Sequence, residues 1–291
     1  MSRAVFGTRF AAGFGKAWLV GGFLFLYLPM ITLIIYSFNK SPLPAVWGGF
    51  TFEWYGKLIH DTEILSGLWM SLKIAFLSAC FSVIFGTLAA FALVKYRRFT
   101  GRTLFSGMVS APLVMPEVIQ GLSLLLMLVA IQGWTQSLFG TAFPEKGLIT
   151  ILLGHMMMGL AYAAVVISAR LQDLNPQLEE AAMDLGAKPW QVFYLVTLPM
   201  ISQSLVSAWL LTFSLSLDDV VVSAFLNGPG STTMPLVIFS RARLGLSPSI
   251  NAVATLIIVA VAVCVTVASI MVARAERRRA AEISAAQRDA S

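Results

Sequence analysis

Charge is what this 291-residue sequence has least of, because only 12% of its residues are charged whereas 58% are hydrophobic. A soluble domain carries about twice that share of charged residues. Too few charges remain to cover the surface of a soluble fold of this length. The composition therefore disfavours a soluble enzyme, a disordered scaffold and a free nucleic-acid-binding protein, although the pI is near 9.5.

Cysteine and histidine are scarce as well. The two cysteines, Cys80 and Cys264, lie inside long apolar runs and have no disulfide or metal-ligand spacing. His60 and His155 are the only histidines, which disfavours a zinc site. The sequence also lacks GxxxxGK followed by Ser or Thr, the phosphate-binding loop of many ATPases. We therefore expect no cofactor, no metal and no enzymatic activity in this chain.

Apolar residues form runs that are long enough to cross a bilayer. A helix needs about 20 apolar residues to span a hydrocarbon core of about 30 Å. The runs of this length are Trp18–Phe38, Leu68–Val94, Leu104–Ile131, Leu148–Ala169, Ile201–Leu226 and Ile250–Ala273. They do not alternate in polarity as the strands of a membrane barrel do. The sequence predicts an all-α integral membrane protein with six transmembrane helices and a single membrane domain over residues 1–291.

Most of the 20 lysines and arginines flank these runs on one side of the membrane. They lie before the first span, after the second and fourth spans, and in a basic tail at 274–291. Cytoplasmic flanks are enriched in these residues, so both termini are predicted to be cytoplasmic. Arg241 and Arg243 oppose the trend, and their role stays open. The first span is longer than a signal-peptide core and lacks an A-x-A cleavage site, so we expect a retained anchor.

The connection at 170–200 contains the sequence NPQLEEAAMDLGAKPWQVFYLVTLP. Asn175, followed by proline, suits the start of a helix. Gly186 suits the left-handed residue that closes it. Pro189 is then expected to begin a second short helix that ends near Pro199.

An apolar stripe runs along the first of these two helices. Leu178, Ala182 and Leu185 are spaced so that they share one face. A cytoplasmic helix with such a stripe needs a surface to bury it. The stripe packs either on the ends of this protein's own helices or in the groove of a partner protein, and the residues alone leave both alternatives open.

Fixed positions in the same connection match a family motif. The motif is Glu-Ala-Ala, three residues, Gly, nine residues, Ile or Val, one residue, and Leu-Pro. It is matched by Glu180, Ala181, Ala182, Gly186, Val196, Leu198 and Pro199. This segment resembles the permease subunits of bacterial ABC importers, with valine in place of the usual isoleucine. The resemblance implies a type I importer permease fold, in which this loop forms coupling helices that dock on a separate ATPase.

The resemblance covers nearly the whole chain. The segments YSFN, GFTFEWY, APLVMPEVIQGLSLL and SLDDVVVSAFLNGPGSTTMPLVIFSRARLGLSPSINAVATL are similar to spermidine/putrescine importer permeases, in particular to the putrescine type. This implies the permease subunit of an ATP-driven polyamine importer in a bacterial inner membrane. The implied partners are a second permease completing a heterodimeric pore, an ATPase dimer holding ATP and Mg, an external polyamine-binding protein and membrane lipid.

Carboxylates inside the predicted spans indicate the cargo independently. Glu117 lies in the third predicted span, and Asp218 and Asp219 lie in the fifth. Ionisable groups inside a bilayer are expensive and mark functional sites. At about 1.5 Å of rise per residue, Glu117 and Asp218 are expected at a similar depth. No basic residue is predicted there, so a diammonium or triammonium cargo would supply the opposite charge along a substrate path.

Each of these candidates also has a structural explanation. Adjacent aspartates point about 100° apart on a helix, so Asp218 or Asp219 could instead bond to backbone opened by a bend. Glu117 follows two prolines and could serve the distortion that they cause. His155 fits best as a packing residue.

Outside the spans, Trp54 stands next to Glu53 and could receive an ammonium cargo over its ring. Tryptophan is also an ordinary anchor at the membrane interface. Two rival functions are the same machine with another cationic solute, and an ion-coupled secondary carrier that uses the aspartates as ion sites. Such a carrier is expected to show inverted repeats with broken helices, and we find no such repeat in the sequence.

Overall fold

The computed structural model describes residues 2–43, 46–96, 98–141, 143–244 and 248–263, together with residues 266, 270 and 274. The described chain is helical, and its only strand-like pairing is an isolated antiparallel bridge between Asn39 and Phe50. The prediction of an all-α protein is therefore confirmed.

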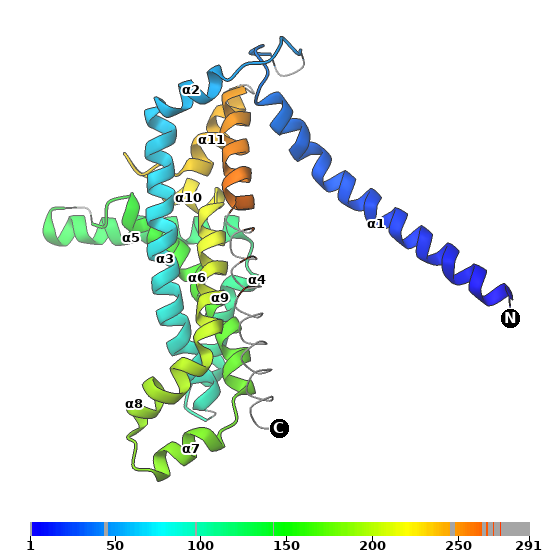
Figure 1. Cartoon of the computed structure of the whole chain (residues 1–291). Coiled ribbons are helices and arrows are strands. Elements are labelled where there is room, and N and C mark those ends of the chain that lie inside the picture. The colour runs from blue at the N-terminus through cyan, green and yellow to red at the C-terminus, as the bar shows by residue number, and fades with distance from the viewer. Residues whose placement is uncertain are drawn as a thin grey trace. The chain divides into compact units, whose positions relative to one another are not determined.

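The chain forms two compact units, which are described separately. The first unit comprises Met1–Asp61 and Arg241–Ser291, and the second comprises Thr62–Ser240. The first contains α1 (Ser2–Tyr36), α2 (Glu53–Ile59) and an apolar helix at Pro248–Val263. The second contains α3 (Thr62–Lys95), α4 (Arg102–Val114), α5 (Glu117–Phe139), α6 (Leu148–Asp173), α7 (Gln177–Asp184), α8 (Pro189–Val192), the π-helical turn η1 (Phe193–Thr197), α9 (Leu198–Leu217) and α10 (Val221–Leu226) (Figure 1). Helix α11 (Met234–Leu244) runs across the boundary of the two units.

Within the described residues, five helices are long and apolar enough to cross a membrane: Gly15–Tyr36, Thr62–Lys95, Glu117–Phe139, Leu148–Asp173 and Pro189–Leu217. Each overlaps one of the first five predicted spans. The predicted sixth span, Ile250–Ala273, is described continuously only as far as Val263. The predicted tail at 274–291 lies, apart from Arg274, outside the described residues.

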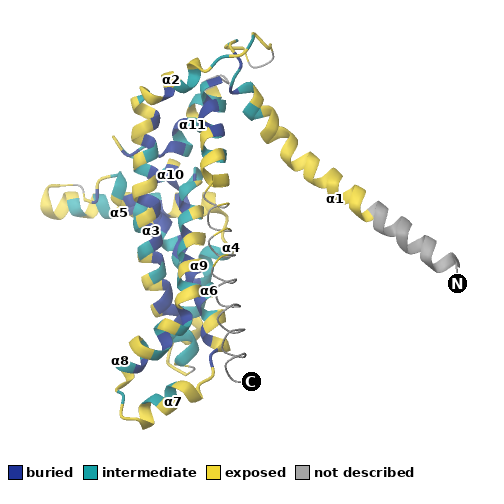
Figure 2. Ribbon diagram, in the orientation of Figure 1, coloured by how far each residue is buried: buried dark blue, intermediate teal, exposed yellow. Residues whose placement is uncertain are grey.

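Helices α3, α6 and α9 form the centre of the second unit, and they pack side by side (Figure 1). Figure 2 shows their buried residues on the inner faces and exposed residues on the outer faces. Most of the buried residues of α3 and α6 are small: Ser71, Ala75, Ser78, Ala79, Ser82, Gly86, Ala89 and Ala90 on α3, and Gly154, Gly159, Ala161, Ala163 and Ala164 on α6. Gly86 lies against Ala163, and Gly159 lies against Ser82. Small residues let helix backbones approach closely, which is how helices associate where lipid removes the hydrophobic driving force.

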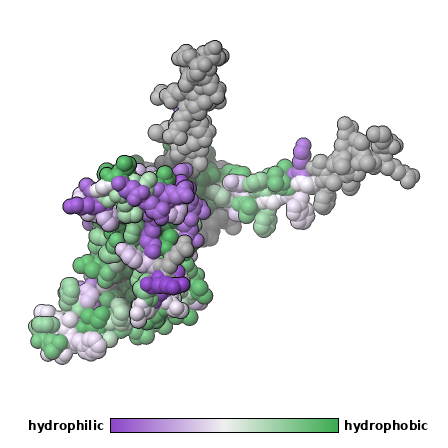
Figure 3. Space-filling view, turned by 90° about the horizontal axis from the view of Figure 1, so that it is seen from below, coloured by the Kyte–Doolittle hydropathy of each residue, from purple (hydrophilic) through white to green (hydrophobic). Residues whose placement is uncertain are grey.

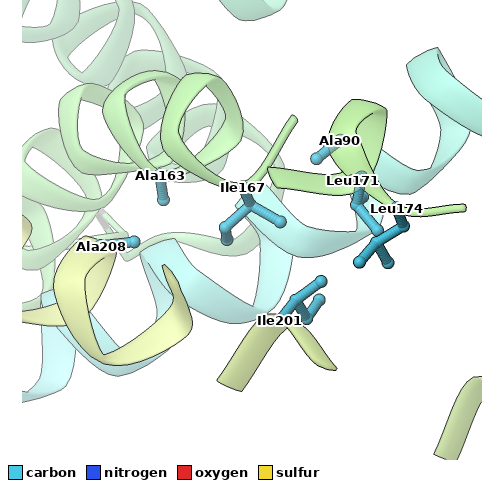
Figure 4. Close-up of a cluster of buried hydrophobic side chains, with 7 residues drawn as sticks. All are labelled: Ala90, Ala163, Ile167, Leu171, Leu174, Ile201 and Ala208. Atoms are coloured by element: carbon cyan, nitrogen blue, oxygen red, sulfur yellow. The ribbon is translucent and has the colours of Figure 1, made fainter. Parts of the chain in front are cut away.

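A cluster of buried apolar side chains (Figure 4) extends to Leu171 and Leu174, at the end of α6 from which the chain continues to α7. Its members are Ala90, Ala163, Ile167, Leu171, Leu174, Ile201 and Ala208. They come from α3, α6 and α9 and from the residue that follows α6. The cluster packs the last turns of α6 against the beginning of α9. The connection that contains α7 therefore begins and ends at packed helices.

The same end of the second unit is polar. Hydrophilic residues gather over it and hydrophobic residues cover the flanks (Figure 3). The charged residues on α7 and at the adjoining helix ends are Lys95, Arg98, Arg102, Arg170, Asp173, Glu179, Glu180, Asp184 and Lys188. The connections after α3 and after α6, predicted to share one side of the membrane, both lie at this end (Figure 1).

The prediction of one continuous helix over Leu104–Ile131 is wrong. Helix α4 ends at Val114, Met115 and Pro116 are extended with ψ of 132° and 137°, and α5 then crosses α3 at a wide angle (Figure 1). Proline lacks an N–H and disfavours helical geometry in the residue before it. The chain therefore changes direction immediately before the residue that was expected deep in a straight helix.

Gln120 satisfies backbone groups at this break. Its Nε2 donates to the carbonyl oxygens of Pro112 and Met115, at 2.7 Å each. Backbone groups freed by a broken membrane helix need such partners, because the bilayer offers no water. Gln120 is only 2% exposed, so this is an internal cap between α4 and α5.

The predicted helix boundary near Pro199 and the fifth span at Ile201–Leu226 also need correction. The helix that begins at Pro189 does not end near Pro199 but continues through the π-helical turn into α9, which ends at Leu217. Proline has no N–H to donate to the preceding turn of a helix. The wider π-helical turn before Pro199 lets the helix continue in spite of this missing hydrogen bond. The chain then leaves the helix before α10 begins at Val221.

The contact between α3 and α6 is tested by Gly86→Ala. An added Cβ would lie 2.7 Å from Ala163 Cβ and 3.0 Å from the Ala164 nitrogen. Such overpacking costs about 1–3 kcal/mol, so the variant is expected to unfold at a lower temperature in detergent micelles. Gly133→Ala is the matched control, because a Cβ at Gly133 meets nothing within 4 Å. Equal unfolding midpoints for the two variants would contradict the close approach.

Candidate functional site

The two adjacent aspartates lie at the break between α9 and α10. Asp218 follows the last residue of α9, and its side chain is exposed. Asp219 is buried, with 6% of the residue exposed. The break therefore directs the two carboxylates into different environments, as the geometry of adjacent residues requires.

The Asp219 carboxylate caps the beginning of α10. Its Oδ1 accepts a hydrogen bond from Val222 N at 3.2 Å, and its Oδ2 accepts one from Ser223 N at 2.7 Å. The first N–H groups of a helix have no partner within the helix, and a carboxylate also favours the positive end of its dipole. At the other end of α10, Thr150 Oγ1 donates to the Leu226 carbonyl at 2.8 Å. Asp219, just before the helix, and Thr150 of α6 thus hold the two ends of α10.

His155 of α6 connects this cap to the centre of the bundle. Its Nε2 lies 3.1 Å from both Asp219 Oδ2 and Ser223 Oγ, and its Nδ1 lies 2.6 Å from Ser216 Oγ. Ser78 Oγ of α3 donates to Ser216 Oγ at 3.0 Å. These five side chains form one buried polar network that joins α3, α6, α9 and α10. Paired in this way, polar groups make a break in a helix rigid, whereas unpaired ones would destabilise it.

The network gives His155 and Asp219 roles in the fold, and it does not test whether Asp219 contacts the cargo. His155 is 2% exposed and has partners at both ring nitrogens, as expected of a packing residue. Asp219 has a role in the fold, which corresponds to the alternative that one aspartate bonds to backbone at a bend. Its place in the substrate path stays a prediction.

Asp218 and Glu117 differ from Asp219 because both are exposed. In the part of the chain that the structure describes, neither carboxylate has a hydrogen bond or an ion pair. Glu117 is the first residue of α5, where a carboxylate favours the helix dipole. Each of these two carboxylates therefore stands next to a helix break, and neither is neutralised by the chain itself.

The structure does not gather the three carboxylates into one cluster. No described contact joins Glu117 to either aspartate, and the turn before α5 removes the straight helix on which the common depth was predicted. The elements that carry them do meet: a Cβ added to Gly121 on α5 would lie 2.6 Å from the ring of Phe225 on α10. Glu117 is one turn before that contact.

Trp54, the fourth candidate, belongs to the first unit. Its Nε1 donates to the Asn39 carbonyl at 2.7 Å, and Lys57 Nζ lies 4.7 Å from the ring centroid. The same ammonium is 2.7 Å from Glu53 Oε1, and its hydrogen bond and charge lower the pKa of Glu53. The ring thus already holds the chain's own ammonium group. A role in receiving cargo stays a prediction.

Arg241, whose role the sequence left open, is a structural residue of the first unit. Its Nη1 and Nη2 lie 2.5 and 2.9 Å from the two carboxylate oxygens of Asp61. This two-pronged geometry is the strong form of an arginine–carboxylate pair. The pair gives Arg241 a role in the fold, and the side of the membrane on which it lies stays a prediction.

The predicted coupling motif is divided between two helices. Its first half lies on and after α7, where Gly186 has a φ of +90° and closes the helix as predicted. Hydrogen bonds from Ala187 N to Ala182 O at 3.1 Å and from Gly186 N to Met183 O at 2.9 Å complete this left-handed cap. The second half, Val196, Leu198 and Pro199, lies on the helix Pro189–Leu217.

The apolar stripe of α7 is not buried by the described residues. Leu185 is 90% exposed and Leu178 is 46% exposed. The alternative in which the stripe packs on the protein's own helix ends therefore fails for Leu185. The other alternative, that the stripe lies in the groove of a partner protein, stays a prediction.

Sequence reasoning missed the residues that hold the site together. Gln120, Ser78, Ser216 and Ser223 received no role, although each is a buried polar side chain in an apolar segment. For Gln120, Ser216 and Ser223 the available signal was a position close to Pro116 or to the aspartate pair, whereas Ser78 had no such signal. Their partners come from distant segments, and no local pattern identifies those.

Asp219→Asn tests the buried network. The amide retains one acceptor oxygen and turns an NH₂ toward donors, so the variant is expected to lose about 1–3 kcal/mol of stability. Asp218→Asn changes an exposed, unpaired group and is expected to unfold as the parent protein does. Thermal unfolding of the full-length chain in detergent measures both variants. Equal losses would show that the structure assigns the two roles wrongly.

The sequence is similar to those of known membrane transport proteins. The family described as "Binding-protein-dependent transport system inner membrane component" matches residues 82–281. The putrescine transport system permease protein PotI of Escherichia coli (strain K12) is 49% identical, over 93% of this chain and 94% of that protein. The spermidine/putrescine transport system permease protein PotC of the same strain is 36% identical, over 88% of this chain and 94% of that protein.

Solved structures agree in fold. The crystal structure of a bacterial alginate ABC transporter, in complex with an alginate pentasaccharide-bound periplasmic protein, contains a chain that matches with a TM-score of 0.70 at 17% identity. The match covers 91% of this chain and 94% of that one. The chain belongs to the family of binding-protein-dependent transport system inner membrane components.

Proposed function

We propose that this permease moves a polyamine, putrescine or spermidine, through a pore that it forms with a second permease. The observation that carries the proposal is the exposed, unpaired carboxylate of Asp218 at the break between α9 and α10. The identity of 49% to a putrescine permease over 93% of the chain supports the same cargo. The fold alone does not choose a cargo, since a chain of an alginate transporter shares it.

Asp218 and Glu117 attract the ammonium groups of the cargo as it passes. Ionised carboxylates are costly in an apolar environment, and a passing cation lowers that cost. A diamine carries two positive charges on an alkyl chain, so its ends match acids while its middle matches apolar walls. Asp219 does not compete for the cargo, because its oxygens are held by α10 and His155.

The machinery around the chain follows the importer plan. An external binding protein delivers the polyamine, and a cytoplasmic ATPase dimer that holds ATP and Mg drives the cycle. Six membrane spans, with Ile250–Ala273 as the sixth, place both termini in the cytoplasm within a single permease domain, and lipid surrounds the outer faces. The half of the coupling motif on α7 (Glu180, Ala181, Ala182 and Gly186) is exposed or half-buried and forms the docking surface for the ATPase.

An ion-coupled carrier is the rival of another class, and the helix breaks at Met115–Pro116 and Asp218–Val220 are a feature that such carriers use. Family membership opposes this function. Uptake driven by a proton or sodium gradient without ATP would support the carrier, and a strict requirement for ATP supports the importer.

Uptake of radiolabelled putrescine into proteoliposomes that hold the full complex tests the cargo. We expect Asp218→Asn to lower uptake about tenfold, which corresponds to about 1.4 kcal/mol of lost interaction, with basal ATPase activity retained. Glu145→Gln is the control, since it neutralises another exposed acid, in the connection between α5 and α6. Unchanged uptake in Asp218→Asn, or equally strong uptake of a neutral analogue of the same length, would refute the cargo assignment.

Leu185→Ala tests the docking surface on α7. Burying a leucine contributes about 1.5–3 kcal/mol, so its truncation is expected to weaken ATPase binding about tenfold to a hundredfold. Leu138→Ala is the matched control, because Leu138 is 75% exposed at the end of α5. Affinity of the detergent-solubilised permease pair for the ATPase provides the measurement. Identical affinities for both variants would exclude Leu185 from the interface.

A further inference from the structure

Glu179 stands immediately before the Glu-Ala-Ala of the coupling motif and turns toward the bundle. Its side chain is 19% exposed, whereas the next residue, Glu180, is exposed. Leu185, the residue that follows α7, is 90% exposed. Helix α7 therefore has one acidic side chain that is partly enclosed by the rest of the chain, and it ends next to an apolar residue that is not enclosed.

Both oxygens of the Glu179 carboxylate are used. Its Oε2 lies 2.5 Å from Lys95 Nζ, and its Oε1 accepts a hydrogen bond from Thr197 Oγ1 at 2.8 Å. Lys95 is the last residue of α3, and Thr197 is the last residue of the π-helical turn that leads into α9. One carboxylate thus joins α7 to two helices of the bundle.

The partners of Glu179 are themselves enclosed. The Lys95 side chain is 24% exposed, and Thr197 is 1% exposed. Thr197 occupies the unspecified position of the motif, between its Val and its Leu-Pro. Charge-assisted hydrogen bonds are about twice as strong as neutral ones, and partial burial protects this pair from solvent and salt. The contact therefore ties the two halves of the motif to each other and to α3.

The backbone connects α7 to the bundle more flexibly than the Glu179 contact does. Helix α7 joins α6 through Leu174, whose ψ is 135°, and joins α8 through Gly186 and Lys188, which are left-handed and extended. Non-helical residues of this kind absorb rotation, as hinges do. A displacement of α7 would be lost in them unless a side chain linked α7 directly to the bundle.

We propose that Glu179 is a positioning residue that transmits the movement of α7 to α3 and α9 through Lys95 and Thr197. This inference rests on the proposed docking of α7 on an ATPase. It adds a second task to the motif region: exposed residues receive the movement, and Glu179 passes it to the membrane helices. Removing the charge pair leaves docking intact and separates ATP hydrolysis from transport.

The test is Glu179→Gln in the complete complex, reconstituted in proteoliposomes with the binding protein. Glutamine keeps the size of the side chain and an acceptor for Thr197 but loses the ion pair with Lys95. We expect assembly, thermal stability and basal ATPase activity close to the parent complex, while putrescine transported per ATP hydrolysed falls about fivefold or more. Asp173→Asn, which neutralises an exposed acid in the last turn of α6, is the control and is expected to keep the parent ratio.

A charge exchange provides the second variant. Lys95→Glu alone places two acids together and is expected to lower the ratio further, and Lys95→Glu combined with Glu179→Lys is expected to recover part of it. A wild-type ratio in Glu179→Gln would overturn the inference and leave the proposed function standing. A fall in stability and basal activity in proportion to transport would also overturn it, because the contact would then serve only the fold. Absence of ATP-dependent transport in the parent complex would overturn the proposed function and this inference together.

Discussion

The structure depends on one constraint: a membrane helix that breaks must find partners for its freed backbone groups inside the protein. Asp219 meets this need at the start of α10, and Gln120 meets it between α4 and α5. His155 then anchors the first of these caps to the seam of small residues between α3 and α6. With both breaks fixed, the chain holds Asp218 and Glu117 exposed beside them without neutralising either carboxylate.

The carboxylates that cap helix breaks differ from the carboxylates that the chain leaves exposed. Asp219 is buried and paired, whereas Asp218 and Glu117 are exposed and their carboxylates have no partner among the described residues. A similar division occurs at the polar end of the second unit, where Glu179 is held by Lys95 and Thr197 while Leu185 is exposed. Asp219 is adjacent to the exposed Asp218, and Glu179 lies six positions before the exposed Leu185. Residues that are close together in the sequence, in the acidic pair and in the motif, therefore have different roles.

Much of the fold could be predicted from the sequence, because apolar length and the left-handed position of Gly186 are local properties. The breaks could not. Pro116 redirects the chain, but Pro199 lies in a helix that continues through a π-helical turn, so the same residue type has opposite effects in different packing environments. The pairing of His155 with Asp219 joins residues 64 positions apart, and that of Lys95 with Glu179 joins residues 84 apart. Only the packed helices determine such pairs.

The central claim is that Asp218 faces the path of the cargo whereas Asp219 is built into the fold. The most direct measurement is the reaction of Asp218→Cys and Asp219→Cys with a small, positively charged thiol reagent, in the assembled complex and with Cys80 and Cys264 replaced by serine. The account predicts that position 218 reacts, that putrescine with the binding protein slows this reaction, and that position 219 stays unreactive while the complex is folded. Reaction at position 219, or reaction at position 218 that putrescine does not slow, would contradict it.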